Sequence, residues 1–549
     1  MPRYDTGALS GTLVMKNFQD TFSVEDIPNA AIVVSVPLVA SAFASLMSGP
    51  ITDRIGRKKY FFVAVTTQCV GAVIQITAKA FHALLIGRII AGAALGMLSM
   101  LVPLYQSEIA RPEHRGRLIT FYQLGVTLGF CIAFWIDYGT SRLVNGLSWK
   151  LPVSLQVAPP TIMFFGLFFL PESPRWLIYR GRFDDALAIL THLRVNHGTS
   201  IDRDLQMEFV GIVQDVTFDK IYSSKTYTAL LEKGIENNRK RTLLGIGIHM
   251  LTQLTGINVL LFYLPHILQS TGFTEINSEL LGNGVSGIVN MLATIPVFFF
   301  IDKWDRRRVL KIASLCMAIC MFTIATVLGI YSDKSKQTEA HIYPGSIIDV
   351  TVYINDTRAT YCILALLCMF VACFALSWGP LGWIYPAEIY PQLIRAKAMG
   401  VTTASSYCFN VAISQIAPVL FRYITWGTYV VFGCSCVMIA WIVHVYYPET
   451  RGRSLEEIHL IFSGALIDLE RPGVHHPKTA AQALEHLQNQ LKHLSDCTEN
   501  AAAGNKKHAR NNRAKVLSSP PVLHPRYKRY STQEEEMWRI SAGSLVSLP

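Results

Sequence analysis

The chain has 549 residues, of which 51% are hydrophobic and only 16% are charged. Soluble domains carry about 25% charged residues, so this composition argues against an ordinary soluble enzyme. The 11 cysteines fall mostly inside apolar runs and form no CxxC pair, which argues against a disulfide-stapled module and against a zinc or redox site.

The net charge of +11 is unevenly placed along the chain. Lysine and arginine gather in alternate loops, and the loops between them are poorer in positive charge. This bias is typical of the cytoplasmic loops of membrane proteins and argues against a nucleic-acid partner. The basic clusters lie at residues 54–59, 111–117, 239–241, 303–308 and 395–397.

Apolar runs of about 20 residues, each long enough to cross a bilayer as a helix, dominate the rest of the pattern. A polar break near residues 178–240 divides them into two groups. The runs predict an all-α membrane protein. In chain order they lie near residues 30–50, 60–80, 83–106, 117–137 and 152–170, and then near 242–267, 281–301, 309–331, 360–386, 398–420 and 426–447.

Residues 1–14 cover only about 21 Å as a helix, which is too short to span a membrane alone. We expect the chain to begin inside its first helix, with no signal peptide before it. The predicted organisation is an N-terminal half over 1–177 with a truncated first helix, a cytoplasmic helical linker domain over 178–240, a C-terminal half over 241–460 and a largely disordered cytoplasmic tail over 461–549.

Three sequence patterns recur in the same order in the two halves. Residues 49–59 resemble 298–308, residues 107–115 resemble 387–395, and residues 171–173 resemble 448–450. This indicates a duplicated six-span unit whose halves are parallel repeats. An insertion near 332–360 carries the triplet Asn355-Asp356-Thr357, which predicts N-glycosylation of Asn355 on the outer face.

Five motifs resemble the sugar porter family of the major facilitator superfamily. The resemblance spans nearly all of residues 4–458 and implies alternating access around a site near the bilayer midplane. The motifs are Tyr4-Asp5-Thr6-Gly7 with Ser10-Gly11, Gly87-Arg88 with Gly92 and Gly96, the run 171–177 (PESPRWL), the run 253–258 (QLTGIN) and the run 448–452 (PETRG).

A sugar offers hydroxyls that donate and accept, so a dry site suits amides together with an aromatic face for the ring. An alternative role for amides in apolar helices is to join helices. The resemblance places Gln123, Gln253, Asn258 and Asn290 on the family's sugar-binding amides, and Gly379 and Trp383 on its sugar-facing backbone and indole. Further candidates are Asn410 and, where the chain departs from the family's amides, Thr252 and Ser406.

Asp5 and Arg88 are charges deep in predicted spans, and such residues are functional candidates because burying them is costly. Paired with Arg88, the carboxylate is expected to stay ionised, and apart from it the carboxylate is expected to take up a proton. The resembling symporters carry this pair, which implies proton coupling. The alternative is a static salt bridge. His249 is expected to be an interior histidine rather than a proton carrier.

Charged residues recur at the cytoplasmic helix ends of both halves. We expect the carboxylates to cap helix N-termini and to pair with arginines across the halves, forming a gate that favours the outward-open state. The alternative is solvated loop charges of little effect. The predicted gate residues are Asp53, Arg57, Glu108, Arg115, Glu172, Arg175, Asp302, Arg306, Glu388, Arg395 and Glu449.

These features predict a multi-pass carrier and not an enzyme, because no P-loop, HExxH, GxSxG or dinucleotide motif occurs. The predicted function is inward transport of a hexose or pentose with a proton, in the plasma membrane, with no metal and no cofactor beyond the coupling proton. Alternatives are a sugar sensor that signals through its tail, a carrier of a polyol or quinate-like solute, and an inactive truncated product. The expected partners are the sugar and the lipid bilayer; none is assigned to the tail.

Overall fold

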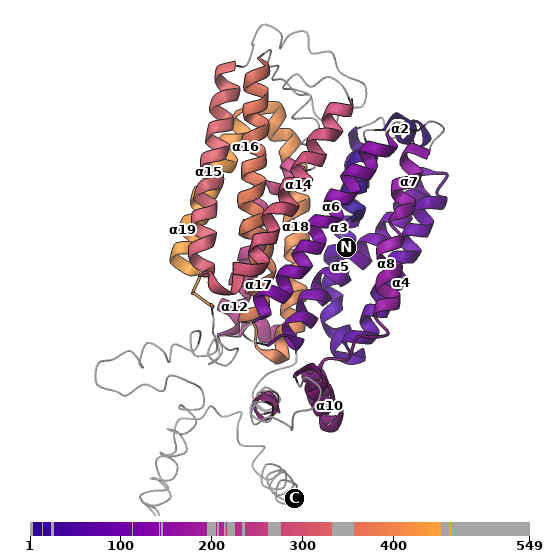
Figure 1. The fold of residues 1–549 in the computed structure, drawn as a ribbon, viewed down its shortest axis with the longest axis vertical. Coiled ribbons are helices and arrows are strands. Elements are labelled where there is room, and N and C mark those ends of the chain that lie inside the picture. The colour runs from indigo at the N-terminus through magenta and orange to yellow at the C-terminus, as the bar shows by residue number, and fades with distance from the viewer. Residues whose placement is uncertain are drawn as a thin grey trace, which may run out of the picture. The chain divides into compact units, whose positions relative to one another are not determined.

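The computed structural model describes most of the chain as helices. Its described residues are 4–13, 15–22, 27–111, 114–141, 143, 147–194, 205, 208–213, 216, 226–232, 237–261, 276–331, 356–451 and 462, and they contain no β-strand. All of them lie in the first of two units, Met1–Leu469. Figure 1 shows their long helices gathered in two bundles, one from each part of the sequence.

The first bundle holds the helices that precede residue 170. A short α1 and α2 come before three long helices and a pair of shorter ones. Their bounds are α1 Tyr4–Thr12, α2 Lys16–Phe22, α3 Ile27–Ile55, α4 Arg57–Thr77, α5 Phe81–Ile109, α6 Arg115–Thr140, α7 Leu147–Leu155 and α8 Ala158–Gly166.

The second bundle holds the helices that follow residue 237. Counted over the described residues of both bundles, 10 helices are long and apolar enough to cross a membrane. The predicted runs number 11, and the one without such a helix is the run over 152–170. The bounds in the second bundle are α12 Asn238–Leu254, α14 Ile276–Phe300, η3 Ile301–Lys303, α15 Arg306–Tyr331, α16 Thr357–Leu376, α17 Trp378–Ile389, α18 Gln392–Ile424 and α19 Gly427–Tyr446.

Two predicted spans are interrupted in the structure. The run expected over 152–170 is formed by α7 and α8, which are separated by a turn at Gln156 and Val157. Pro159 and Pro160 follow this turn at the start of α8, where proline is tolerated because its missing N–H needs no helical acceptor. The run expected over 360–386 breaks at Ser377, which leaves helical geometry between α16 and α17.

The two bundles meet along two helix pairs, α3 with α18 and α6 with α14. Small residues allow this approach: a Cβ atom on Gly49 would lie 2.8 Å from the Cα atom of Lys397, and one on Gly400 would lie 2.7 Å from the carbonyl oxygen of Ser45. On the other pair, a Cβ on Gly287 would lie 3.1 Å from the Phe134 ring. Such contacts replace the hydrophobic driving force that lipid does not supply.

Residues between the bundles form short helices at the end that the charge pattern predicts to be cytoplasmic. Helices α9 (Pro174–Tyr179) and α10 (Phe183–Arg194) share an apolar cluster with Leu205, Ile212 and Val216. The 3-10 helix η2 (Tyr227–Leu231) follows, and the Tyr227 hydroxyl donates to the Leu46 carbonyl of α3 at 2.6 Å. The predicted glycosylation site Asn355 and the predicted tail over 461–549, apart from Phe462, lie outside the described residues.

Candidate functional site

A cluster of polar side chains is built around a break in the helix that begins at α12. The helix stops at Thr255, Gly256 adopts a φ of 84°, and helical geometry resumes at residue 257. Across this break the Asn258 amide donates to the Gln253 side-chain carbonyl. Gln253 in turn donates from Nε2 to Ser406 Oγ of α18 at 3.1 Å. Three predicted site residues therefore form one hydrogen-bonded chain.

The second bundle also presents the predicted aromatic face. The break at Ser377 places Gly379 and Trp383 in the first turns of α17. A Cβ on Gly379 would lie 2.9 Å from Nε2 of Gln123, so the glutamine of α6 lies directly on this backbone. The indole of Trp383 packs edge-on against Tyr122, with ring centroids 5.6 Å apart. The two bundles thus meet at the predicted site.

His249, one turn before Gln253 on α12, contacts the aromatic side of the predicted site. His249 is 2% exposed, and its ring centroid lies 5.1 Å from that of Trp383 in a T-shaped arrangement. The imidazole therefore fixes the orientation of the indole from the α12 side. This contact agrees with an interior histidine and ties it to the site.

The remaining predicted site residues lie on α12, α14 and α18. Asn290 is buried, and its side-chain oxygen has no hydrogen-bond partner in the described part of the chain. Asn410 accepts a bond from Ser414 at 3.2 Å. Thr252 bonds back to the Ile248 carbonyl at 2.7 Å and lies 3.5 Å from the position of a Cβ on Gly382. Buried amides with unused donors or acceptors can form hydrogen bonds with the hydroxyls of a polyol.

A contact between the bundles at this level involves a residue not predicted for the site. The hydroxyls of Ser99 on α5 and Tyr407 on α18 lie 2.7 Å apart and share a hydrogen bond. Tyr407 is 4% exposed. Its sequence signal is its place directly after Ser406, where the resembling family has a tryptophan. The Tyr407 hydroxyl therefore makes this contact between α5 and α18 a polar one.

The predicted ionisable pair is formed. Arg88 Nη1 of α5 lies 2.8 Å from Asp5 Oδ1 of α1, and the two residues are 3% and 5% exposed. Hydrogen-bonded charges are tolerated in a low-dielectric interior, whereas removing either partner leaves a costly lone charge. The structure therefore brings both predicted coupling residues together in the first bundle.

At the cytoplasmic end, matching carboxylates cap matching helices in the two bundles. Glu172 accepts the backbone N–H groups of Arg57 and Lys58 at the start of α4, at 2.9 and 3.2 Å. Glu449 accepts those of Arg306 and Arg307 at the start of α15, both at 3.0 Å. Both caps place a negative charge at the positive end of a helix dipole.

The matching arginines pair with matching glutamates. Arg57 binds Glu108 through two bonds of 3.0 and 2.9 Å, whereas Arg306 reaches Glu388 through one contact of 3.4 Å. The aspartate one turn before each arginine also contacts it, at 3.4 Å for Asp53 and 3.6 Å for Asp302. These pairs lie within a bundle rather than between bundles.

Two ion pairs do cross between the bundles, and their cations were not among the predicted gate residues. Asp302 accepts from the Arg117 backbone at 3.3 Å and contacts its side chain at 3.4 Å. Asp53 lies 3.9 Å from Lys397 Nζ. Arg117 and Lys397 stand at the same distance after Arg115 and Arg395, so the repeat itself was the signal that could have found them.

The predicted Arg115, Arg175 and Arg395 are all buried. Arg395 donates to the Tyr390 carbonyl of its own bundle at 3.1 and 2.9 Å. The two ion pairs described above between the bundles use Arg117 and Lys397 as their cations. A carboxylate shared between the bundles can hold this end closed and can be released when the bundles separate.

The two copies of the basic loop differ at one position. Gly56 has a φ of 97°, which favours glycine, whereas Asp305 stands at the matching position with no positive φ. The 3-10 helix η3 precedes it, so the second loop takes another path. Asp305 accepts from Arg451 at 2.8 Å, and this hydrogen bond lowers the pKa of the carboxyl below its usual range.

Among the described residues, no three or more histidine, cysteine, aspartate or glutamate side chains gather in a group that could hold a metal ion. The site described above is therefore one of amides, hydroxyls, aromatic rings and a buried ion pair. Amides and hydroxyls can hydrogen-bond the hydroxyls of a neutral polyhydroxylated solute, and aromatic rings can pack on its C–H groups.

Comparison with known proteins gives matches over the same region. A family model for sugar (and other) transporters matches residues 1–462. The chain is 30% identical to a high-affinity glucose transporter of Kluyveromyces lactis, over 83% of this chain and 81% of the relative. It is 31% identical to a glucose transporter of Aspergillus flavus, over 84% of this chain and 87% of the relative.

Solved structures show the same fold. A proton:xylose symporter of the major facilitator superfamily, bound to 6-bromo-6-deoxy-D-glucose, aligns with a TM-score of 0.68 at 23% identity, covering 84% of this chain and 98% of that one. The Escherichia coli xylose transporter in a partially occluded inward open conformation aligns with a TM-score of 0.62 at 23% identity, covering 82% and 96%. The predicted major facilitator fold is confirmed.

Proposed function

The chain belongs to the sugar (and other) transporter family, and we propose that it carries a monosaccharide inward across the plasma membrane together with a proton. The observation that supports this most is the presence, in one helical unit, of an amide and indole cluster where the bundles meet and of a buried Asp5–Arg88 pair. The relatives named as glucose transporters support a hexose as the solute.

Sugar binding is proposed to exchange internal hydrogen bonds for bonds to the solute. The bonds from Asn258 to Gln253 and from Gln253 to Ser406 satisfy these groups while the site is empty. Sugar hydroxyls can replace them at little net cost because each amide both donates and accepts. The Trp383 indole offers its apolar surface to the C–H groups of the ring.

Proton coupling is assigned to Asp5. An external proton neutralises the carboxylate and releases it from Arg88. The bundles then rock about the bound sugar, and the cytoplasmic pairs Asp53–Lys397 and Asp302–Arg117 open. After the sugar leaves, the guanidinium favours the ionised carboxylate again, and the proton departs on the cytoplasmic side.

The test is uptake of labelled glucose and labelled xylose in cells that lack their own hexose transporters, at acidic and neutral external pH. We expect faster uptake at acidic pH. Gln253→Ala should raise KM about tenfold, because it removes hydrogen bonds worth about 1 kcal/mol each. Gln68→Ala is the matched control, because Gln68 is a buried amide of α4 that belongs to no part of the site.

Two outcomes would contradict the proposal. One is the absence of uptake of either sugar when the protein is present at the cell surface. That result favours the sensor or a different solute, such as a polyol. The other is an equal KM for Gln253→Ala and Gln68→Ala, which would place the sugar elsewhere in the bundle.

A further inference from the structure

A second carboxyl group lies deep in the first bundle and has a different environment from Asp5. Asp137 of α6 is 0% exposed, and neither of its carboxylate oxygens is bonded to a side chain in the described part of the chain. The nearest group is the backbone of Gly11 on α1. No ion pair among the described residues includes it. Asp5, at a similar exposure, is bound to Arg88.

Asp137 lies where α1 packs most closely on α6. Gly7 and Gly11 stand one turn apart on α1; a Cβ on Gly7 would lie 2.9 Å from the Cβ of Ala133, and one on Gly11 would overlap the Asp137 carboxylate. The small residues let the two backbones approach, as in other helix pairs in lipid. The Asp137 carboxyl is therefore enclosed between α6, which carries it, and α1.

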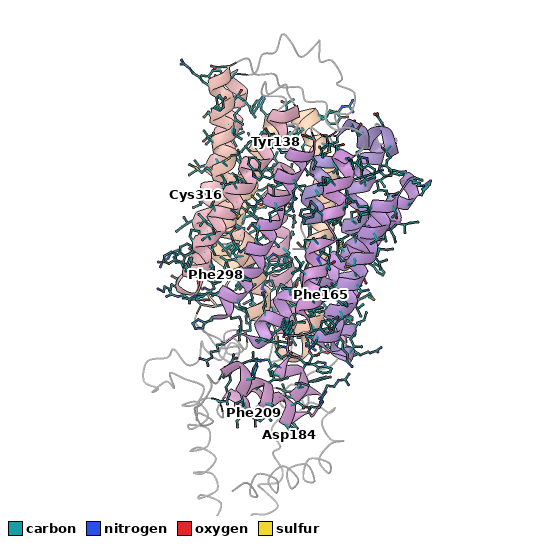
Figure 2. The ribbon with its side chains drawn as sticks, turned by 45° about the vertical axis from the view of Figure 1, so that its right-hand side comes forward. Tyr138, Phe165, Asp184, Phe209, Phe298 and Cys316 are labelled. Atoms are coloured by element: carbon teal, nitrogen blue, oxygen red, sulfur yellow. The ribbon has the colours of Figure 1, made fainter. Side chains whose placement is uncertain are left out.

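This contact lies near the outer end of the bundle. Tyr138, the neighbour of Asp137, lies at the end opposite to Asp184 and Phe209, as Figure 2 shows. The residues that follow Gly11 cover this end with an apolar cluster, in which Phe18 and Phe22 pack edge-on or tilted against one another and Trp149. The cluster shields the outer end of α1 from water.

Among the described residues of the neighbouring elements, no cation pairs with Asp137. From α1, the Tyr4 hydroxyl donates to the Pro152 carbonyl at 3.1 Å. Arg88 of α5 is held by Asp5. From α7, Lys150 is exposed and lies over the Trp149 ring. Helix α14 carries no charged residue from Gly284 to Phe300.

An isolated carboxylate in an apolar interior loses many kcal/mol of hydration, so such a group is held neutral. We propose that Asp137 is a second proton-binding site, which holds its proton as a neutral carboxylic acid while α1 packs on α6 and releases it when water enters this contact. This site goes beyond the proposed function, because its occupancy does not depend on coupling at Asp5.

The consequence for transport does rest on the proposed function. Helix α1 carries Asp5, and it is the same helix that covers Asp137. A displacement of α1 that lets Asp5 exchange its proton also loosens the cover over Asp137. The two acids then titrate in linked steps, and the pH dependence of uptake contains a contribution from each.

The direct test is the infrared carbonyl band of a protonated carboxylic acid in the purified full chain at neutral pH. We expect the band in the wild type and in Asp5→Asn, its loss in Asp137→Asn, and a shifted band in Asp137→Glu. Asp20→Asn is the control, because Asp20 is exposed on α2. Absence of the band from the wild type, or its persistence in Asp137→Asn, would overturn the proposal.

A transport readout separates this proposal from the proposed function. Asp137→Asn should retain sugar counterflow and show a changed pH profile of uptake, whereas Asp5→Asn removes proton coupling altogether. If Asp137→Asn does not accumulate, the wild-type and Asp137→Glu spectra still decide the matter, because both retain the carboxyl. A profile identical to the wild type would contradict the linked titration, while coupling through Asp5 would stand.

Discussion

The two bundles carry the same charges at their cytoplasmic ends and different chemistry inside the membrane. Glu172 and Glu449 cap equivalent helices, and Arg57 and Arg306 meet equivalent glutamates. Inside, the first bundle holds the Asp5–Arg88 pair. The described interior of the second holds Gln253, Asn258 and other amides and hydroxyls, with the imidazole of His249.

This contrast separates the features that both repeats carry from those that only one repeat carries. Arg88 and Cys368 stand the same number of residues before Glu108 and Glu388, so the charge inside the membrane has a neutral counterpart. The cytoplasmic charges serve closure, which needs both bundles. Under the proposed function, the proton-binding pair belongs to the first bundle, whereas the sugar site takes most of its side chains from the second bundle and Gln123 from the first.

The largest expected effect is a loss of stability when Glu108 or Glu388, the matching partners of Arg57 and Arg306, is neutralised. Glu108→Gln leaves Arg57 buried with its main partner neutralised, and loss of a buried pair costs about 3 to 5 kcal/mol. Glu388→Gln should cost less, because Glu388 makes one contact of 3.4 Å with Arg306, whereas Glu108 makes two shorter bonds to Arg57. Thermal unfolding of the two purified variants measures the difference. A larger loss for Glu388→Gln would contradict the comparison.

A smaller effect is expected from the two pairs that join the bundles. Arg117→Gln combined with Lys397→Gln removes both cations that cross to the other bundle. Partly exposed pairs contribute up to about 1 kcal/mol each, so the balance should shift toward the inward-open state by up to about 30-fold. The measurement is the labelling rate, from the cytoplasmic side, of a cysteine introduced by Gly382→Cys.

The control for this shift is Arg182→Gln. Its ion pair with Asp185, at 2.7 Å, is exposed and lies entirely within the α10 region. The labelling rate should stay at its starting value in this variant. An unchanged rate in the double variant, or an equal increase in the control, would show that the crossing pairs do not hold the cytoplasmic end closed.

Adding an amide at Thr252 tests whether this residue lines the sugar site. Thr252→Gln places a second amide beside Gln253, where the resembling family has one. A new hydrogen bond is worth about 1 kcal/mol, so we expect KM for glucose to fall about fivefold. Thr77→Gln is the control, because Thr77 makes the same bond to its own helix backbone but is exposed on α4. A rise in KM for Thr252→Gln would place the threonine outside the site.

The smallest effect concerns Asp305, whose pKa the hydrogen bond from Arg451 lowers. The ionised form is therefore favoured in the folded state. Its contribution to stability is present above the ordinary pKa of an aspartate and is lost as the pH falls through the lowered value. Asp305→Asn should differ slightly from the wild type in thermal stability at neutral pH, and the difference should vanish in acid. A difference that grows on acidification would contradict this sign.

Much of the fold follows from sequence because lipid imposes a strong rule. A backbone in the bilayer must satisfy its own hydrogen bonds, so apolar runs of about 20 residues become helices. The breaks within two of the predicted spans were harder to predict from the sequence. Pro159 and Pro160 mark the start of α8, and Pro380 stands at the matching place in the first turn of α17, just after the break at Ser377. A proline there cannot donate to the carbonyl four residues before it, so it favours the end of α16.

The site could be predicted in part because buried amides and charges are rare in apolar helices. Asp5 and Arg88 lie on different helices, and only their cost in lipid and the resemblance indicated that they meet. Asp137 carries the same signal and was overlooked, because it stands at the last residue of the apolar run 117–137 and reads as the start of a loop. The packing of α1 on α6 buries it.

Proton coupling through Asp5 in the first bundle is proposed to be separable from sugar recognition at the amide cluster where the bundles meet. Reconstituted vesicles that hold wild type or Asp5→Asn allow two assays of one protein: glucose uptake driven by a pH gradient, and glucose counterflow without one. The account predicts that Asp5→Asn loses gradient-driven accumulation and retains counterflow. Gradient-driven accumulation equal to that of the wild type, or loss of counterflow in a folded variant, would contradict it.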